Sequence, residues 1–267
     1  MVAMHALTDD QLRRAAPSIF AGQPHTGVSS RYGFVPTLEV VDALRGEGWW
    51  PVQAAQTRTR DVARREVTRH VVRFRRLDDP IQVGDSLAEL VLTNSHDRSC
   101  AYRFDVGLLR LACLNGLVVS HGDFEAIRIR HGVRVVDEVL EASAEVIAHI
   151  PQVVQSVEQF RGLTLAPNER RVYAESALEA RYGEDWSQKS PVTPDALLVP
   201  RRVDDAGADL WRTYNTVQEN LIRGGLRGRS RTGRRLRTRR VNSVAEDVRL
   251  NKALWTLAER LAALKAA

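Results

Sequence analysis

The stretch FEAIRIRHGVRVVDEVLEASAEVIAHIPQVVQSVEQF, residues 124–160, changes its hydrophobic period at Gly132, and this change decides the fold class. Before the glycine, Ile127–Arg130 alternates apolar and basic residues, which is typical of a strand with one buried face. After the glycine, apolar residues recur at helical spacing. We therefore expect a strand followed by one long helix to about Arg161, kinked at Pro151.

The sequence on either side of this stretch separates a strand-rich half from a helical half. Upstream, residues 83–120 are dense in strand and turn signals, and two more strands are expected near 49–57 and 67–76. Three downstream segments show helical spacing: 168–182, 208–222 and 244–264. Strands and helices do not alternate, so the sequence predicts the α+β class, with an N-terminal antiparallel β-meander packed on a long helix and a helical C-terminal half.

The same patterns predict three regions along the chain. Residues 1–30 are weakly patterned and predict a loose N-terminal arm. Residues 31–165 are expected to form the α+β core, which contains the meander and the long helix. Residues 166–267 are expected to form a helical region with an arginine-rich loop at 223–240.

The composition excludes several classes of protein. With 43% hydrophobic and 27% charged residues in 267, the chain has the balance of a soluble globular protein. Its apolar runs are too short to span a bilayer, and its first thirty residues lack the apolar core of a secretory signal. Cys100 and Cys113 are too few for a disulfide framework or a four-cysteine zinc site. We expect a cytoplasmic protein that has no membrane partner.

The positive charge is concentrated in one segment. The chain has 39 basic and 33 acidic residues, a net charge of +6. Nine arginines and no acid lie within Arg223–Arg240, and without them 30 basic residues face 33 acidic ones. This segment also has four glycines and no aromatic residue, which predicts a flexible basic loop suited to a polyanion. The alternative is a solvated loop that is neutralised by counterions.

A second group of eight arginines lies within Arg58–Arg76. Period-two alternation places Arg69, Arg73 and Arg75 on one face of a strand and apolar residues on the other. Arg128 and Arg130 repeat the pattern opposite isoleucines. We therefore expect a half-covered sheet whose open face is positive.

Adjacent tryptophans open the first expected strand. Trp49 and Trp50 should point to opposite faces, and the outward ring could stack on a nucleic-acid base. The alternative is that both are buried between sheet and helix. Trp211 and Trp255, which lie at helical spacing among leucines, are expected in the core.

Motifs for enzymatic chemistry are weak in this sequence. It contains no dinucleotide-binding, P-loop or HExxH pattern, so we expect no cofactor. The best candidates for metal ligands are His96, Asp97, His121 and Asp123, because histidine and aspartate ligate metals and the two loops could meet. Adjacent residues such as His96 and Asp97 normally point apart, and all four residue types are common in turns.

Several strings together resemble a known family. RLACLNGLV begins at Arg110 and follows the loop that starts at Asn94, and LWRTYNTVQENLIRGG begins at Leu210. With Thr238-Arg239-Arg240 and the later NKALW string, they resemble the phage/plasmid-like family called domain of unknown function nine-hundred-thirty-two. The resemblance implies a mobile-element setting and DNA metabolism, and it supplies no catalytic residues. The order of elements is also similar to that of phage single-strand annealing proteins, which bind DNA backbones in a positive groove, often as rings or filaments.

We therefore expect a nucleic-acid-binding protein of a mobile element, which binds or anneals single-stranded DNA without catalysis. A homo-oligomer would be compatible with this role. One alternative is a regulator or inhibitor that binds a host replication or defence protein, and another is a metal-dependent nuclease that uses Asp85 with the four candidate metal ligands. The residues expected to contact nucleic acid are Arg69, Arg73, Arg75, Arg128, Arg130, Arg227, Arg229, Arg231, Arg234, Arg235, Arg237, Arg239, Arg240, Trp49 and Trp50.

Overall fold

The computed structural model describes residues 5–25, 34–61, 64–111, 115–119, 127–129 and 135–266. The chain divides into two compact units. Unit 1 comprises the described residues up to Pro151 together with Ser243–Ala245, and unit 2 comprises Gln152–Asn242 and the chain from Glu246 onward. The division falls inside the long helix, whereas the sequence placed it at 165/166.

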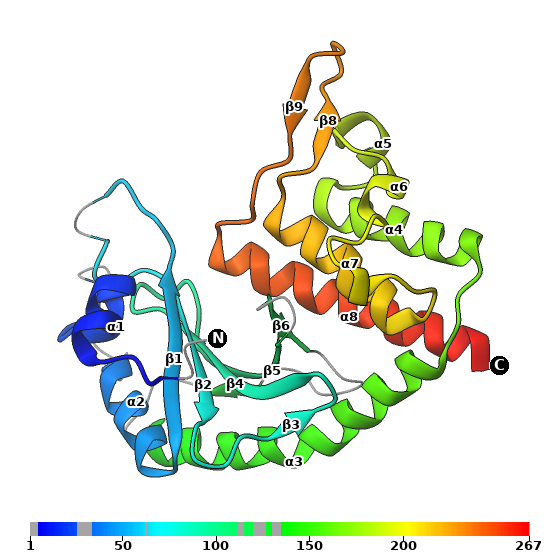
Figure 1. The fold of residues 1–267 in the computed structure, drawn as a ribbon. Coiled ribbons are helices and arrows are strands. Elements are labelled where there is room, and N and C mark those ends of the chain that lie inside the picture. The colour runs from blue at the N-terminus through cyan, green and yellow to red at the C-terminus, as the bar shows by residue number, and fades with distance from the viewer. Residues whose placement is uncertain are drawn as a thin grey trace. The chain divides into compact units, whose positions relative to one another are not determined.

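Unit 1 is built around an antiparallel sheet (Figure 1). Helix α3 (Val135–Gly162) follows the last strand of this sheet, so the chain changes from strand to helix between Ile129 and Val135, as the change of period predicted. The strands are β1 (Trp49–Gln56), β2 (His70–Arg76), β3 (Gln82–Val83), β4 (Ser86–Asn94), β5 (Tyr102–Arg110), β6 (Asn115–Val118) and β7 (Ile127–Ile129). Their order is β1-β2-β4-β5-β6, with β3 paired to β4 and β7 paired to β5. With the helical C-terminal half, this arrangement confirms the predicted α+β class.

One face of this sheet is apolar. Phe74 pairs with Leu90 across β2 and β4, and Leu92 pairs with Phe104 across β4 and β5. All four side chains have no exposed surface. The part of α3 that belongs to unit 1 runs along the sheet (Figure 1) and buries residues at helical spacing such as Val139. The helix continues through Pro151.

The N-terminal residues 5–25 differ from the loose arm that the sequence predicted. They form α1 (Asp9–Ala15) and the 3-10 helix η1 (Pro17–Phe20). A capping box between Thr8 and Gln11 starts α1, and Leu12 and Ile19 are fully buried. The burial of these two apolar side chains stabilises both helices, although the segment is too short to show a clear period in the sequence. A further helix, α2 (Thr37–Gly46), contacts β1.

Unit 2 is helical, and an aromatic cluster occupies its core. The Trp255 ring lies 5.2 Å from Phe160 and 5.7 Å from Tyr214, and Tyr214 stacks on Trp211 at 5.7 Å. Trp211 and Trp255 are therefore core residues, as predicted. The helices are α4 (Pro167–Tyr182), α5 (Trp186–Lys189), α6 (Pro194–Leu197), η2 (Val203–Asp205), α7 (Leu210–Arg223) and α8 (Val244–Ala266). Nowhere in the described residues is a helix both long and apolar enough to cross a membrane.

Candidate nucleic-acid interface

The arginine-rich segment between α7 and α8 is an ordered β-hairpin rather than a flexible loop. Strands β8 (Arg227–Arg229) and β9 (Arg235–Arg237) pair antiparallel and stand out from the helices of unit 2 (Figure 1). Arg227 lies opposite Arg237, and Arg229 lies opposite Arg235. Because side chains alternate along a strand, these four arginines share one face of the ribbon. The pair between them, Gly228 and Leu236, faces the other way.

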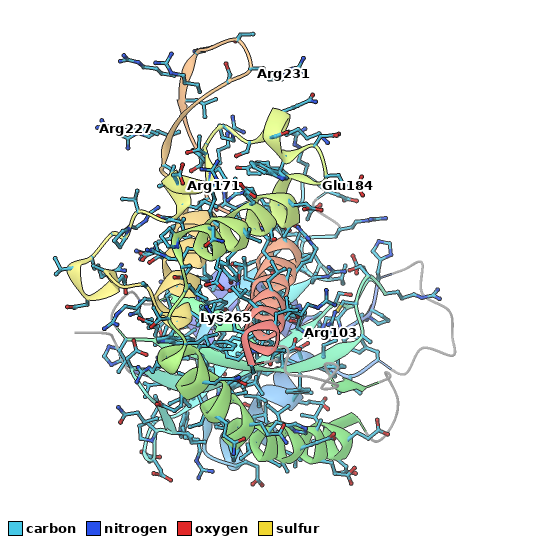
Figure 2. The ribbon with its side chains drawn as sticks, turned by 90° about the vertical axis from the view of Figure 1, so that its right-hand side faces the viewer. Arg103, Arg171, Glu184, Arg227, Arg231 and Lys265 are labelled. Carbon is cyan, nitrogen blue, oxygen red and sulfur yellow. The ribbon has the colours of Figure 1, made fainter. Side chains whose placement is uncertain are left out.

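The hairpin presents its charge to solvent. Figure 2 shows the side chains of Arg227 and Arg231 extending away from the hairpin backbone. Within the part of the chain that the structure describes, no carboxylate forms an ion pair with any of its eight exposed arginines. Like charges directly opposite each other on a ribbon repel, so a bound anion would relieve this repulsion. The eight are Arg227, Arg229, Arg231, Arg234, Arg235, Arg237, Arg239 and Arg240.

A close backbone contact seats the hairpin on its own unit. The Arg229 amide donates a hydrogen bond to the Pro191 carbonyl oxygen at 2.9 Å. A Cβ atom on Gly228 would lie 2.1 Å from that oxygen, so only glycine permits this approach. The apolar face of the ribbon is thus held against the segment between α5 and α6, and the arginine face remains open.

The base of the hairpin is fixed by further hydrogen bonds. Gly225 donates to the Thr238 carbonyl at 2.8 Å, and the Thr238 amide donates to Leu226 at 2.9 Å. The Arg181 guanidinium, from the end of α4, donates to the Arg239 carbonyl at 2.6 Å. Gly224 adopts φ 64°, and a Cβ there would meet the Arg239 backbone at 2.6 Å. These contacts fix the point at which both strands leave the helices.

Glu219 neutralises the arginines beneath the hairpin. Its carboxylate accepts hydrogen bonds from Arg202 at 2.5 and 2.7 Å and from Arg223 at 2.6 Å. Burial acts to raise the pKa of Glu219, but the hydrogen bonds and charges of the two arginines outweigh it and hold that pKa below its usual value. Of the nine arginines in the segment, Arg223 is therefore already paired within the protein. The i,i+4 spacing of Glu219 and Arg223 on α7 was a visible signal for their ion pair, whereas the pair with Arg202 joins α7 to the start of η2 and depends on the tertiary fold.

Two sheet arginines do not form the expected open positive face. Arg73 and Arg75 share a face, as predicted, but each is only 5% exposed. Glu89 of β4 accepts from the Arg73 Nη1 at 2.7 Å and from the Arg75 Nε at 2.6 Å. The prediction that they would be free to bind phosphate is wrong, because one buried carboxylate occupies both guanidinium groups.

Glycines on the neighbouring strands make room for the Arg73 side chain. A Cβ on Gly116 would lie 2.6 Å from its Cζ, and one on Gly107 would lie 3.2 Å from its Nη1. The guanidinium also donates to the Leu117 carbonyl at 3.2 Å. Arg73 therefore lies flat across β5 and β6, where it packs and neutralises charge within the sheet.

The remaining sheet candidates give little support to a binding face. Arg69 precedes β2 and is half-buried, and its guanidinium donates to the Ser99 carbonyl. The Arg128 side chain and the whole of Arg130 lie outside what the structure describes. Trp49 is 2% exposed, which excludes stacking by that ring, whereas Trp50 is half-buried.

His96 belongs to a buried hydrogen-bond cluster. The Thr37 hydroxyl lies 2.9 Å from His70 Nε2, 3.0 Å from His96 Nε2 and 3.1 Å from Asn94 Nδ2. His70 Nδ1 lies 3.1 Å from the Thr68 carbonyl, which can only accept, so we assign the proton to Nδ1. Nε2 then accepts from Thr37, and the Thr37 oxygen accepts from Asn94 and His96. Burial lowers the pKa of His70 to about 4, which agrees with this neutral form.

The metal candidates are not assembled by the described residues. His96 has no exposed surface, whereas Asp97 caps the following turn by accepting from the Ser99 amide at 3.0 Å. His121 and Asp123 lie outside the described residues. Within the residues that are described, no three His, Cys, Asp or Glu side chains are grouped as a metal site requires. Asp85 forms an ion pair with Arg110 at 2.7 Å.

Fold and site together define an α+β protein with an antiparallel sheet in its N-terminal half and an exposed arginine hairpin in its C-terminal half. Residues 24–255 match the family model described as "Domain of unknown function (DUF932)", and the chain belongs to this family. It is 42% identical over 255 residues to UPF0380 protein YafZ of Escherichia coli K12, covering 96% of this chain and 91% of the relative. UPF0380 protein YfjQ of the same organism is 41% identical with the same coverage. No solved structure matches the chain.

Proposed function

We propose that this protein binds nucleic acid through the arginine hairpin, residues 227–240, without catalysing a reaction. The observation that carries the proposal is the set of eight exposed arginines on one anchored hairpin that lacks an acidic residue. Guanidinium groups suit phosphate because their planar array of donors contacts two oxygens at once. A row of phosphates is the anion that would occupy several such groups together.

Backbone contacts should dominate this binding. If six of the eight arginines each neutralise one phosphate, affinity should fall about a thousandfold between about 50 and 200 mM salt. Arginine can contact guanine, but the hairpin contains none of the Asn, Gln, Asp or Glu side chains that read adenine and cytosine. We therefore propose that the protein binds with little dependence on sequence, as the role in a mobile element suggested by the family resemblance would allow.

One of the two observations that favoured single-stranded DNA, an exposed tryptophan for base stacking, is weakened by the structure. Trp49 is buried and only Trp50 retains accessible surface. Binding or annealing of single-stranded DNA remains a form of the proposed function that the similar order of elements in phage single-strand annealing proteins suggests. The hairpin geometry bears on the type of strand separately and is considered below.

The test is a binding assay on the purified, nuclease-treated protein with labelled DNA. It should compare the wild type with a variant in which Arg229, Arg231, Arg234, Arg235 and Arg237 are replaced by glutamine. None of the five has an ion pair in the described structure, so we expect thermal stability to be retained and DNA binding to be strongly weakened. Equal binding by both proteins would contradict the proposal. Capture of a stoichiometric acidic protein by the wild type alone, without any DNA binding, would favour the protein-binding alternative.

A further inference from the structure

We infer that the ligand of the hairpin is a DNA duplex and that the paired strands β8 and β9 enter its major groove. This inference rests on the proposed function and specifies its substrate. It follows from the arrangement of the arginines in two rows on a ribbon, from the anchoring of that ribbon, and from the residue types that it lacks.

The two rows match the two backbones of a groove. Arg227 and Arg229 form one row and Arg235 and Arg237 form the other, on strands about 4.8 Å apart. The major groove of DNA is about 12 Å wide and admits a two-stranded ribbon. A ribbon lying in the groove would direct one row toward each phosphate backbone. A single strand has one line of phosphates, which can occupy one row closely and leaves the other row unneutralised.

The anchoring keeps the two rows together before any ligand arrives. Facing arginines repel each other, and two strands of three residues would not hold them alone. The close contact of Gly228 with the Pro191 carbonyl and the hydrogen bonds of Thr238 at the base hold the two strands together. The ordering is therefore already present in the free protein, and less affinity is lost to it on binding.

The tip of the hairpin extends the charged surface beyond the paired residues. Gly233 adopts φ 79° and donates to the Ser230 carbonyl at 2.9 Å, while the Ser230 and Thr232 hydroxyls lie 2.9 Å apart. This compact turn places Arg231 and Arg234 at the end of the ribbon (Figure 2 labels Arg231). Both arginines can contact phosphates further along the groove.

Residue types within the hairpin also favour a duplex. Proteins that hold single strands without sequence preference combine positive charge with aromatic rings on which bases stack. Arg223–Arg240 contains no aromatic residue. The hairpin can therefore neutralise phosphates but cannot replace the stacking that an unpaired base loses.

The experiment measures fluorescence anisotropy with a three-turn duplex and with each of its two component strands. At about 200 mM salt we expect the duplex to bind at least about tenfold more tightly than either strand, because two rows are occupied instead of one. Equal or tighter binding of the single strands would overturn the inference and leave the proposed function standing. Binding of neither form would overturn both.

Two variants and a chemical footprint test the placement in the groove. R227Q/R237Q and R229Q/R235Q should each reduce the slope of log affinity against log salt by about two for the duplex. R161Q/R260Q, which removes two exposed charges from helices of unit 2, should leave the slope unchanged. Guanine N7 lies in the major groove, so bound protein should protect it from methylation. Full methylation under saturating protein, or equal slopes for the hairpin variants and the wild type, would refute the groove placement.

Discussion

Replacing Gly228 with alanine should weaken nucleic-acid binding although it removes no charge. The added Cβ would lie 2.1 Å from the Pro191 carbonyl oxygen and 2.8 Å from its carbonyl carbon. Backbone atoms cannot move aside as a flexible side chain can, so β8 must move away from the Pro191 carbonyl. The Arg229 amide would then lose its 2.9 Å hydrogen bond to Pro191, and the facing arginines would lose part of the restraint that keeps them together.

The magnitude follows from the interaction that is lost. A backbone hydrogen bond contributes about 0.5–1.5 kcal/mol to stability. In the variant, the free energy needed to position β8 must come from binding instead, so the affinity falls. A loss of about 1 kcal/mol weakens binding about fivefold. The salt dependence should be unchanged, because all eight arginines remain. Fluorescence anisotropy measures the affinity, and hydrogen exchange of the Arg229 amide should become faster in the variant.

A matched control separates this effect from a general effect of alanine. Gly162 ends α3, and a Cβ there meets nothing within 4 Å, so G162A should bind as the wild type does. Wild-type affinity and wild-type exchange at Arg229 in G228A would refute the reasoning about the seat. A large loss of thermal stability in G228A would also refute it, because it would mean that this contact holds the whole unit together.

Three further outcomes follow from unit 1 and from the hairpin surface. E89Q leaves Arg73 and Arg75 buried without their carboxylate, and should lower the free energy of unfolding in urea by about 3–5 kcal/mol. Acidification should destabilise the fold by up to about 3 kcal/mol as pH falls from 6.5 toward 4. In this range His70 binds a proton in the unfolded state but not in the folded state, where burial lowers its pKa to about 4. H70Q should reduce that dependence in urea titrations; an unchanged pH profile would count against the buried cluster. R231Q/R234Q should melt no lower than the wild type in calorimetry, and a clear drop would reveal tip contacts that oppose this account.

The fold class could be predicted because it depends on local period. Alternation before Gly132 and helical spacing after it mark β7 and α3 without any knowledge of neighbours. The N-terminal α1 and η1 were missed because they are held by contacts with β1 and α2, where Leu12 of α1 and Ile19 of η1 are buried. A seven-residue helix offers too few apolar positions for its period to be recognised.

The candidate site was predicted in its charge but not in its shape. The local excess of arginine is visible in the sequence, whereas the pairing of β8 with β9 depends on strands of three residues. The alternation in Arg227-Gly228-Arg229 and Arg235-Leu236-Arg237 around a turn that contains Gly233 was the available signal, and the density of glycine obscured it.

Alternation along one strand could not predict whether the sheet arginines are exposed or buried. Alternation assigns Arg73 and Arg75 to a face, but whether that face is open depends on the other strands that share it. Glu89 reaches them only because the register sets Phe74 opposite Leu90. Register is a property of two strands together, so a reading of one strand at a time could not supply it.

The central claim is that the arginine hairpin neutralises phosphates, and the salt dependence of duplex binding tests it most directly. The account predicts a slope of log affinity against log salt near −5 for the wild type, for about six phosphate contacts. Replacing the five arginines at 229, 231, 234, 235 and 237 with glutamine should bring the slope close to −1. Identical salt slopes for the two proteins, or a wild-type affinity that does not change with salt concentration, would contradict the claim.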